Sequence, residues 1–193
     1  MTADNIEPMD SEILEHLKAQ ACQDRRHAGF CSWHDRSPEG KGIAEAGIVD
    51  DLLTAMRAEG LSDFQSVGAS GEQWPDVWLA GRAGERIPCE ITELVDEAAL
   101  PAGASSPEVL DELVDSLQAI LDHKGRRSLG GRSGAQSVLV IHTDEFYLNA
   151  DTVIGALRNA VFKKPATIQR AFLLLSYDPS RGGYRYFDLP LAA

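Results

Sequence analysis

The chain has no long hydrophobic run and nothing that resembles a secretion signal. Its longest apolar segment, Ala171 to Leu175, is five residues long, whereas a membrane-spanning helix needs about 20 apolar residues. The first residues, Met1 to Pro8, are polar and acidic, unlike a signal peptide, which is basic and then apolar. The sequence therefore predicts a soluble, cytoplasmic protein that does not insert into a membrane.

Cysteine is also scarce. There are three cysteines, and Cys89 falls on the predicted buried face of a strand, so no disulfide framework is expected. Cys22, Cys31 and His34 have the spacing C-x8-C-x2-H, which misses the paired ligands of structural zinc sites. No G-x-S-x-G motif occurs, so an α/β-hydrolase nucleophile has no support.

Positive charge is in short supply, and it is unevenly distributed. The 18 basic and 30 acidic residues give a net charge of -12, which argues against a nucleic-acid footprint over the whole surface. Residues 1–123 carry 8 basic and 25 acidic side chains, whereas residues 124–193 carry 10 and 5. Four cations fall close together with no acid among them: Lys124, Arg126, Arg127 and Arg132. Two interpretations stay open, a basic patch for nucleic acid or cations that complement a helix end and a solvated loop.

Hydrophobic periodicity predicts an α/β domain that fills the whole chain. Helices are predicted over residues 10–21, 43–59, 105–124 and 149–162, with Gly60 as a C-terminal stop. Strands are predicted near residues 63–67, 73–80, 85–92, 137–141, 168–176 and 184–189, and turns or loops over 22–42, 125–134 and 142–145. Three strands in succession followed by alternating helices and strands indicate a mixed central sheet flanked by helices. Residues 1–42 would form an N-terminal helix and an irregular arm outside this core.

Two acidic residues, Asp76 and Glu90, lie on the predicted hairpin of the second and third strands. Successive side chains of a strand point to opposite faces. The apolar positions are Val77, Leu79, Ile87, Cys89 and Ile91, and the polar positions of opposite parity are Asp76, Glu90 and Thr92. If Ala80 pairs with Arg86, then Asp76 faces Glu90 with Cβ atoms about 4.5–5.5 Å apart. Carboxylates that close repel unless a proton or a cation lies between them, so the sequence predicts a magnesium site.

These residues, in this order of elements, resemble a known superfamily. Pro75-Asp76, a spacer of thirteen residues and Glu90-Ile91-Thr92 are similar to the motif of the PD-(D/E)XK nucleases over roughly residues 43–143. The resemblance implies a restriction-endonuclease-like αβββαβ core with an extra N-terminal helix and C-terminal strands. It also implies that Asp76 and Glu90 bind Mg²⁺ or Mn²⁺ and that the protein hydrolyses phosphodiesters of nucleic acid.

The motif departs from the superfamily at Thr92, which stands where a lysine orients the attacking water or the phosphate. A hydroxyl carries no charge at neutral pH and cannot replace an ammonium there. Superfamily members can carry the lysine on the following helix instead, and Lys124 is the candidate because it continues the apolar stripe of Leu117 and Leu121. Glu45, on the sheet-facing side of the first core helix, is the candidate for the helix acid that assists.

Three functions therefore stay open. The first is a metal-dependent nuclease that uses the residues just named. The second is a catalytically inactive binding or regulatory module of the same fold, which Thr92 and the net charge of -12 favour. In the third, the hairpin acids are coincidental: Asp76 caps local backbone, and Glu90 is an exposed strand residue paired with Arg82 or Arg86.

Overall fold

The computed structural model describes residues 38–61, 63–69, 74–94, 107–128, 136–143, 148–175, 178 and 182–192. These residues form three helices and eight strands, in the order α3 (Pro38–Ala58), β1 (Phe64–Ala69), β2 (Val77–Gly81), β3 (Arg86–Glu93), α4 (Pro107–Ser128), β4 (Ser137–Thr143), α5 (Ala150–Leu157), β5 (Phe162–Lys163), β6 (Ile168–Leu175), β7 (Tyr186–Asp188) and β8 (Leu191–Ala192). The predicted helix over residues 10–21 lies outside the described residues. No helix among the described residues is long and apolar enough to span a membrane.

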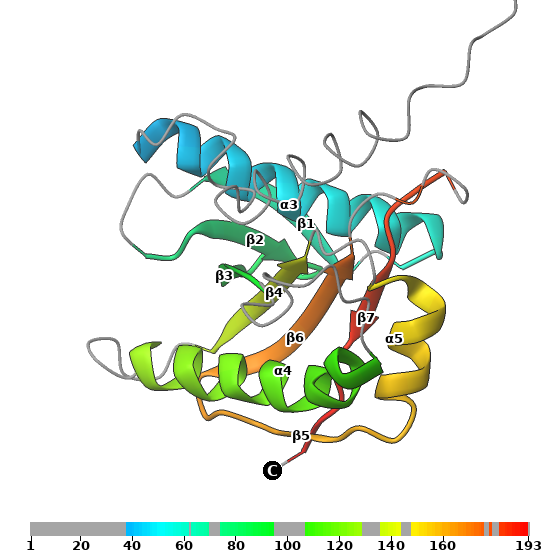
Figure 1. Cartoon of the computed structure of the whole chain (residues 1–193). Helices are drawn as coiled ribbons and strands as arrows, with labels where there is room; N and C mark the ends of the chain where they lie inside the picture. The colour runs from blue at the N-terminus through cyan, green and yellow to red at the C-terminus, as the bar shows by residue number, and fades with distance from the viewer. Residues whose placement is uncertain are drawn as a thin grey trace, which may run out of the picture.

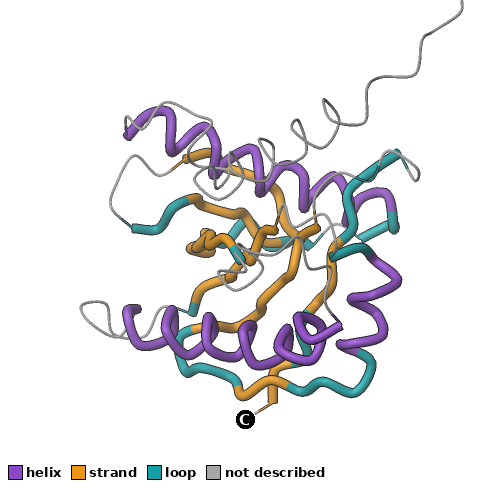
Figure 2. The backbone as a smooth tube through the Cα atoms, in the orientation of Figure 1, coloured by secondary structure: helices purple, strands orange, loops and turns teal. Residues whose placement is uncertain are grey.

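The main sheet is mixed, as the sequence predicts. Its six strands have the order β1-β2-β3-β4-β6-β7. The pairs β1/β2, β2/β3 and β6/β7 are antiparallel, whereas β3, β4 and β6 run parallel to one another. Parallel neighbours need a crossover, which α4 provides between β3 and β4 and α5 provides between β4 and β6. A second sheet pairs the short strands β5 and β8 (Figure 2).

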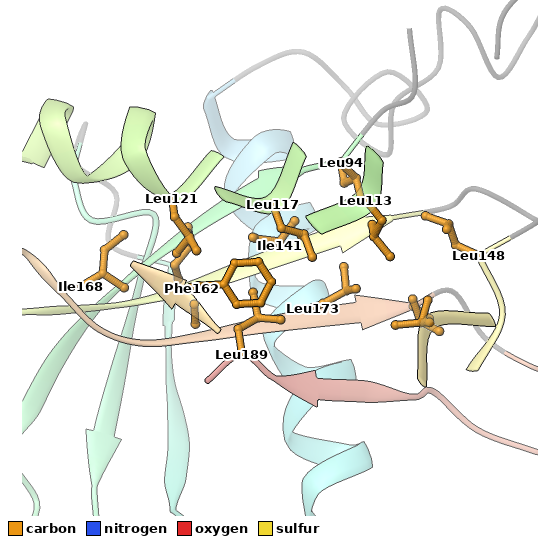
Figure 3. Packing of buried hydrophobic residues seen from close by; sticks show 14 of the residues in the cluster. Leu94, Leu113, Leu117, Leu121, Ile141, Leu148, Phe162, Ile168, Leu173 and Leu189 are labelled. Atoms are coloured by element: carbon orange, nitrogen blue, oxygen red, sulfur yellow. The ribbon is translucent and has the colours of Figure 1, made fainter. Parts of the chain in front are cut away.

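Helices cover both faces of the main sheet, with α3 on one face and α4 and α5 on the other (Figure 1). Side chains of alternating parity therefore enter two cores, and every residue of β4 is buried. On the α4 face, Leu113, Leu117 and Leu121 point toward the sheet, and the ring of Phe162 lies close to them (Figure 3). The α3 face is built from Val77, Leu79, Cys89 and Ile91 of the hairpin, together with α3, β4 and β6. The hairpin residues of odd number thus lie in the core, as the parity predicts.

The C-terminal end of α4 differs from the prediction. The glycine and basic residues from Gly125 onward are predicted as a loop, but α4 continues to Ser128. A Cβ atom on Gly125 would come within 2.5 Å of the Cβ of Pro165, and the Gly125 carbonyl accepts a hydrogen bond of 3.2 Å from Thr167 Oγ1. Gly125 therefore permits close packing against the chain before β6, and it does not end the helix.

Other boundaries also differ, among them the start of β2, which is Val77 and not residue 73. Helix α3 begins at Pro38, five residues before the predicted start at residue 43, and α5 ends at Leu157 where residue 162 was predicted. Phe162 instead begins β5. Its ring is buried in the core of the α4 face, with 1% of the residue exposed, so the chain has left the helix before it reaches this residue. Strand β4 extends over His142 and Thr143, which are predicted to form a turn but are both buried. At the end of α3, Gly60 has a φ of 77°, which confirms the predicted C-terminal stop.

Asn149 is the N-cap of α5, and its role in starting the helix can be tested directly. The Oδ1 atom of Asn149 accepts hydrogen bonds from the N–H groups of Asp151 (3.1 Å) and Thr152 (3.0 Å). Asn149→Ala should lower the free energy of unfolding by about 1 kcal/mol, because these two donors lose their acceptor. The change is measured as a shift of the urea midpoint at constant slope. Asn149→Asp keeps an accepting oxygen and should stay close to wild type, and equal losses in both variants would contradict the capping role.

Candidate active site

The turn between β2 and β3 fixes which residues of the hairpin face each other. Gly81 N–H donates to the Glu85 carbonyl (2.9 Å), and Gly84, with a φ of 81°, donates back to the Gly81 carbonyl (3.0 Å). Ala80 pairs with Arg86, which confirms the predicted register. The pairing runs to Val77 opposite Cys89, so one further step sets Asp76 opposite Glu90.

Asp76 directly precedes β2 and is attached to β3 through its side chain. Its Oδ2 atom accepts a hydrogen bond of 2.8 Å from the N–H of Ile91. This is a contact of the backbone-capping type that the third interpretation expects, and it uses one of the two carboxylate oxygens. It also fixes the carboxylate next to Glu90, because Ile91 is the next residue along β3.

Glu90 is buried, with 7% of its surface exposed. Its Oε1 atom accepts a hydrogen bond of 3.0 Å from Trp74 Nε1, and its Oε2 atom lies 3.7 Å from Lys124 Nζ. The alternative of an exposed glutamate paired with a hairpin arginine is wrong. Arg82 instead bonds Asp63, and the guanidinium of Arg86 lies 4.5 Å from the ring centroid of Trp78. A buried carboxylate needs a cation or hydrogen-bond donors, and Glu90 has one cation, Lys124, and one N–H donor, Trp74.

Lys124 reaches this carboxylate from the α4 helix. Because α4 returns from the end of β3 to the start of β4, its last turns lie alongside β3. Leu117 and Leu121 are fully buried against the sheet, and Lys124 follows on the same stripe. Its Nζ donates a 3.0 Å hydrogen bond to the carbonyl oxygen of Ile91, and its side chain is 16% exposed. The structure therefore brings Lys124 and Glu90 together; the stripe on the helix indicates that Lys124 faces the sheet, but not that it lies over Glu90.

The pKa of the Cys89 thiol depends on burial and on the charges around it. Burial raises its pKa, and the negative charges of Asp76, Glu90 and Glu45 raise it further, whereas the positive charge of Lys124 lowers it. Cys89 is itself completely buried and free. Glu45 is 7% exposed and comes from α3. Four charged side chains thus act on one buried sulfur atom, but Glu45 acts from α3, which covers the face of the sheet opposite to α4 and Lys124.

Other predicted residues are placed less centrally. Thr92 is half-buried on β3 and pairs with Ile141 of β4. The proposed basic patch is divided, because Lys124 points into the site while Arg126, two residues on, is exposed. Arg132 lies outside the described residues, and nothing is stated of the Arg127 side chain.

Of the polar residues that follow residue 141, His142 does not join the carboxylates, and Asp144 and Glu145 lie outside the described residues. His142 is 4% exposed and has the parity of Val138 and Val140, which face α3. Its charge acts on Asp51 of α3, whose pKa is raised by burial and lowered in part by a hydrogen bond to Tyr184 and by His142. Glu90 points to the opposite face, so the sheet separates it from this second polar cluster.

The donors at the site suit a hydrated hard cation. Magnesium is commonly held by one or two carboxylates and keeps several waters, and Asp76 and Glu90 provide such a pair. Among the described residues, no group of three or more His, Cys, Asp or Glu is arranged to hold a metal ion. The described residues of the site therefore offer two carboxylates and not the ligand set of a closed zinc cage.

Comparisons with known proteins give no match. No protein-family model, curated protein or solved structure matches it significantly. The function must therefore be inferred from its own residues and their geometry.

Trp74 is the site residue that sequence reasoning missed. It stands next to Pro75-Asp76, but no periodicity indicates where its indole points. The ring is half-buried and packs edge to face against Trp78, with centroids 6.4 Å apart. Its N–H donates to Glu90, so Trp74 is a positioning residue for that carboxylate.

Removal of the indole N–H tests this positioning role. Trp74→Phe should lower the free energy of unfolding by about 1.5–3 kcal/mol, because a buried carboxylate loses one hydrogen-bond donor. Chemical denaturation measures the change. Trp78→Phe is the matched control, since it also shortens a half-buried indole but leaves the donor to Glu90 intact. An equal loss in both variants would show that ring size, and not the hydrogen bond, accounts for the effect.

Proposed function

We propose that the protein is a divalent-metal-dependent nuclease of the PD-(D/E)XK type, with a restriction-endonuclease-like core. The observation that supports this proposal is the position of the Lys124 ammonium. It lies 3.7 Å from Glu90 Oε2 and 3.0 Å from the carbonyl oxygen between Glu90 and Thr92. A lysine from the following helix thus reaches the strand segment where Thr92 replaces the lysine of the motif.

Each residue has a separate role in the proposed reaction. Asp76 and Glu90 would hold Mg²⁺ or Mn²⁺, which supplies an acidified water and positive charge toward a phosphate when it is bound. Lys124 would orient the attacking water or a phosphate oxygen and stabilise the negative charge that develops. The Ile91 N–H and the Trp74 indole hold the two carboxylates in fixed orientations, and Glu45 would assist only through its charge, from α3 on the other face of the sheet.

A second candidate is a catalytically inactive module of the same fold. Its support is that the Lys124 ammonium already lies near the Glu90 carboxylate and offsets its charge without a metal. A resident ammonium could replace the cation in a protein that binds nucleic acid or another partner and no longer hydrolyses. Thr92 and the net charge of -12 are consistent with such a loss.

A cleavage assay distinguishes the two candidates. The intact protein is incubated with labelled single- and double-stranded DNA and RNA in Mg²⁺, in Mn²⁺ or in EDTA. The nuclease proposal expects cleavage with metal and none in EDTA, and it expects Asp76→Asn to be inactive. Asparagine is a suitable control because its Oδ1 can still accept the hydrogen bond from Ile91 N–H. Metal-independent cleavage, or full activity of Asp76→Asn, would exclude the proposed site. Absence of cleavage by the wild type under every condition would favour the inactive module.

A further inference from the structure

The hairpin carries a strip of side chains that continues from the carboxylate pair. Trp78 pairs with Pro88 and Ala80 pairs with Arg86, and all four share the parity of Asp76 and Glu90. They therefore lie on the same face of the hairpin as the candidate site. A strand advances about 3.3 Å per residue, so Trp78 lies about 7 Å along the strand from Asp76.

On β2, this face of the hairpin is the less covered of the two, whereas Pro88 and Glu90 of β3 are buried on it. On the α3 face, Val77 and Leu79 are 0% and 1% exposed. Trp78 and Ala80, on the other face, are half-buried, and Arg86 is exposed. A large aromatic side chain therefore stays partly accessible directly beside the carboxylates.

The ring of Trp78 is held in place by two contacts. Trp74 packs against it edge to face, with an angle of 76° between the rings, and the Arg86 guanidinium lies 4.5 Å from its centroid. Nucleobases stack on aromatic rings and on arginine planes, and arginine also attracts phosphate. Because the guanidinium of Arg86 lies over one face of the Trp78 ring, the pair offers a nucleotide one planar, positively charged stacking surface, in which the base meets the exposed guanidinium or the free face of the indole.

We propose that the strip formed by Trp78 and Arg86 binds an unpaired nucleotide, so that single-stranded nucleic acid is the preferred substrate. This rests on the proposed function in that the strip adjoins the phosphodiester-cleaving site. An unpaired base is required because the faces of paired bases are covered by their neighbours in a duplex, and stacking on a side chain needs an open face. The positive charge of Arg86 complements the phosphate of the same strand.

Binding measured in EDTA tests the strip separately from hydrolysis. The intact protein is titrated into fluorescein-labelled oligonucleotides, single-stranded and duplex, of one sequence at low salt. Single strands should bind more tightly, and Trp78→Ala should weaken their binding about 5- to 150-fold, the equivalent of one base stack. Trp78→Phe keeps a ring and should retain most of the affinity if Trp78→Ala proves unstable. Arg86→Gln should weaken binding and reduce its salt dependence.

Arg82→Gln is the matched control, because Arg82 lies on the same hairpin but its guanidinium bonds Asp63 at 2.6 Å. Its binding should match that of the wild type. Equal or tighter binding of the duplex, unchanged binding by folded Trp78→Ala and Arg86→Gln, or binding of a protein in place of any nucleic acid would overturn the proposal. Single-strand binding without cleavage in Mg²⁺ would overturn the nuclease function and leave the strip intact. Metal-dependent cleavage that Trp78→Ala and Arg86→Gln do not change would overturn the role of the strip and leave the nuclease function intact.

Discussion

Lys124→Ala should lower kcat for metal-dependent cleavage about 10²–10³-fold, the effect of removing one preorganised electrostatic donor. The ammonium lies 3.7 Å from Glu90 Oε2 and is mostly shielded from water, so no surface cation can replace it. Single-turnover cleavage of a saturating single-stranded oligonucleotide measures the change in the chemical step. Circular dichroism establishes that the variant is folded under the assay conditions.

The matched control for Lys124 is Arg126. It belongs to the same basic stretch but is exposed and lies on another side of α4. Arg126→Ala should leave kcat nearly unchanged, and any effect should appear as weaker substrate binding that depends on salt. If folded Lys124→Ala cleaves at the wild-type rate, the lysine from α4 has no part in the reaction. The same result would remove the strongest support for the nuclease proposal.

Leu121→Ala should destabilise the protein by about 2–5 kcal/mol, the usual cost of truncating a buried leucine. Leu121 is fully buried in the core of the α4 face, and it lies one turn before Lys124. Loosening this turn should also displace the ammonium, so cleavage should fall further than the unfolded fraction explains. Urea denaturation and cleavage below the unfolding transition measure the two effects separately.

Leu174→Ala provides the comparison for Leu121. Leu174 is equally buried but belongs to the core between the sheet and α3. Its truncation should cost a similar free energy of unfolding and leave the activity of the folded fraction near that of the wild type. Equal activity losses per folded molecule in the two variants would indicate that α4 packing does not position Lys124.

The geometry of the hairpin follows from short-range rules, which explains why it could be predicted. Side chains alternate along a strand, and the short turn that links β2 and β3 fixes which residues face each other. Parity therefore identifies Cys89 as buried, and the register sets Asp76 against Glu90. The side of the helix on which Lys124 lies is predictable for a similar reason, because it continues the stripe of Leu117, but its closeness to Glu90 depends on how α4 packs on the sheet.

Other features depend on contacts between distant segments, which periodicity does not encode. A glycine followed by basic residues is typical of a loop, but Gly125 lies within α4, where it packs against Pro165. Strand β5 has two residues and exists because Phe162 is buried and its backbone pairs with that of β8. The indole of Trp74 reaches Glu90 through the path of the chain before β2, and no local pattern specifies that path.

Calorimetric titration with Mg²⁺ and Mn²⁺ tests the central claim most directly, namely that Asp76 and Glu90 form one cation site. The wild type should release or absorb heat as it binds one of these ions at millimolar concentration, and Asp76→Asn should lose this signal. The variant should stay folded, because asparagine can still accept the hydrogen bond from Ile91 N–H. Absence of binding by the wild type at millimolar ion, or unchanged binding by Asp76→Asn, would contradict a metal site between these two carboxylates.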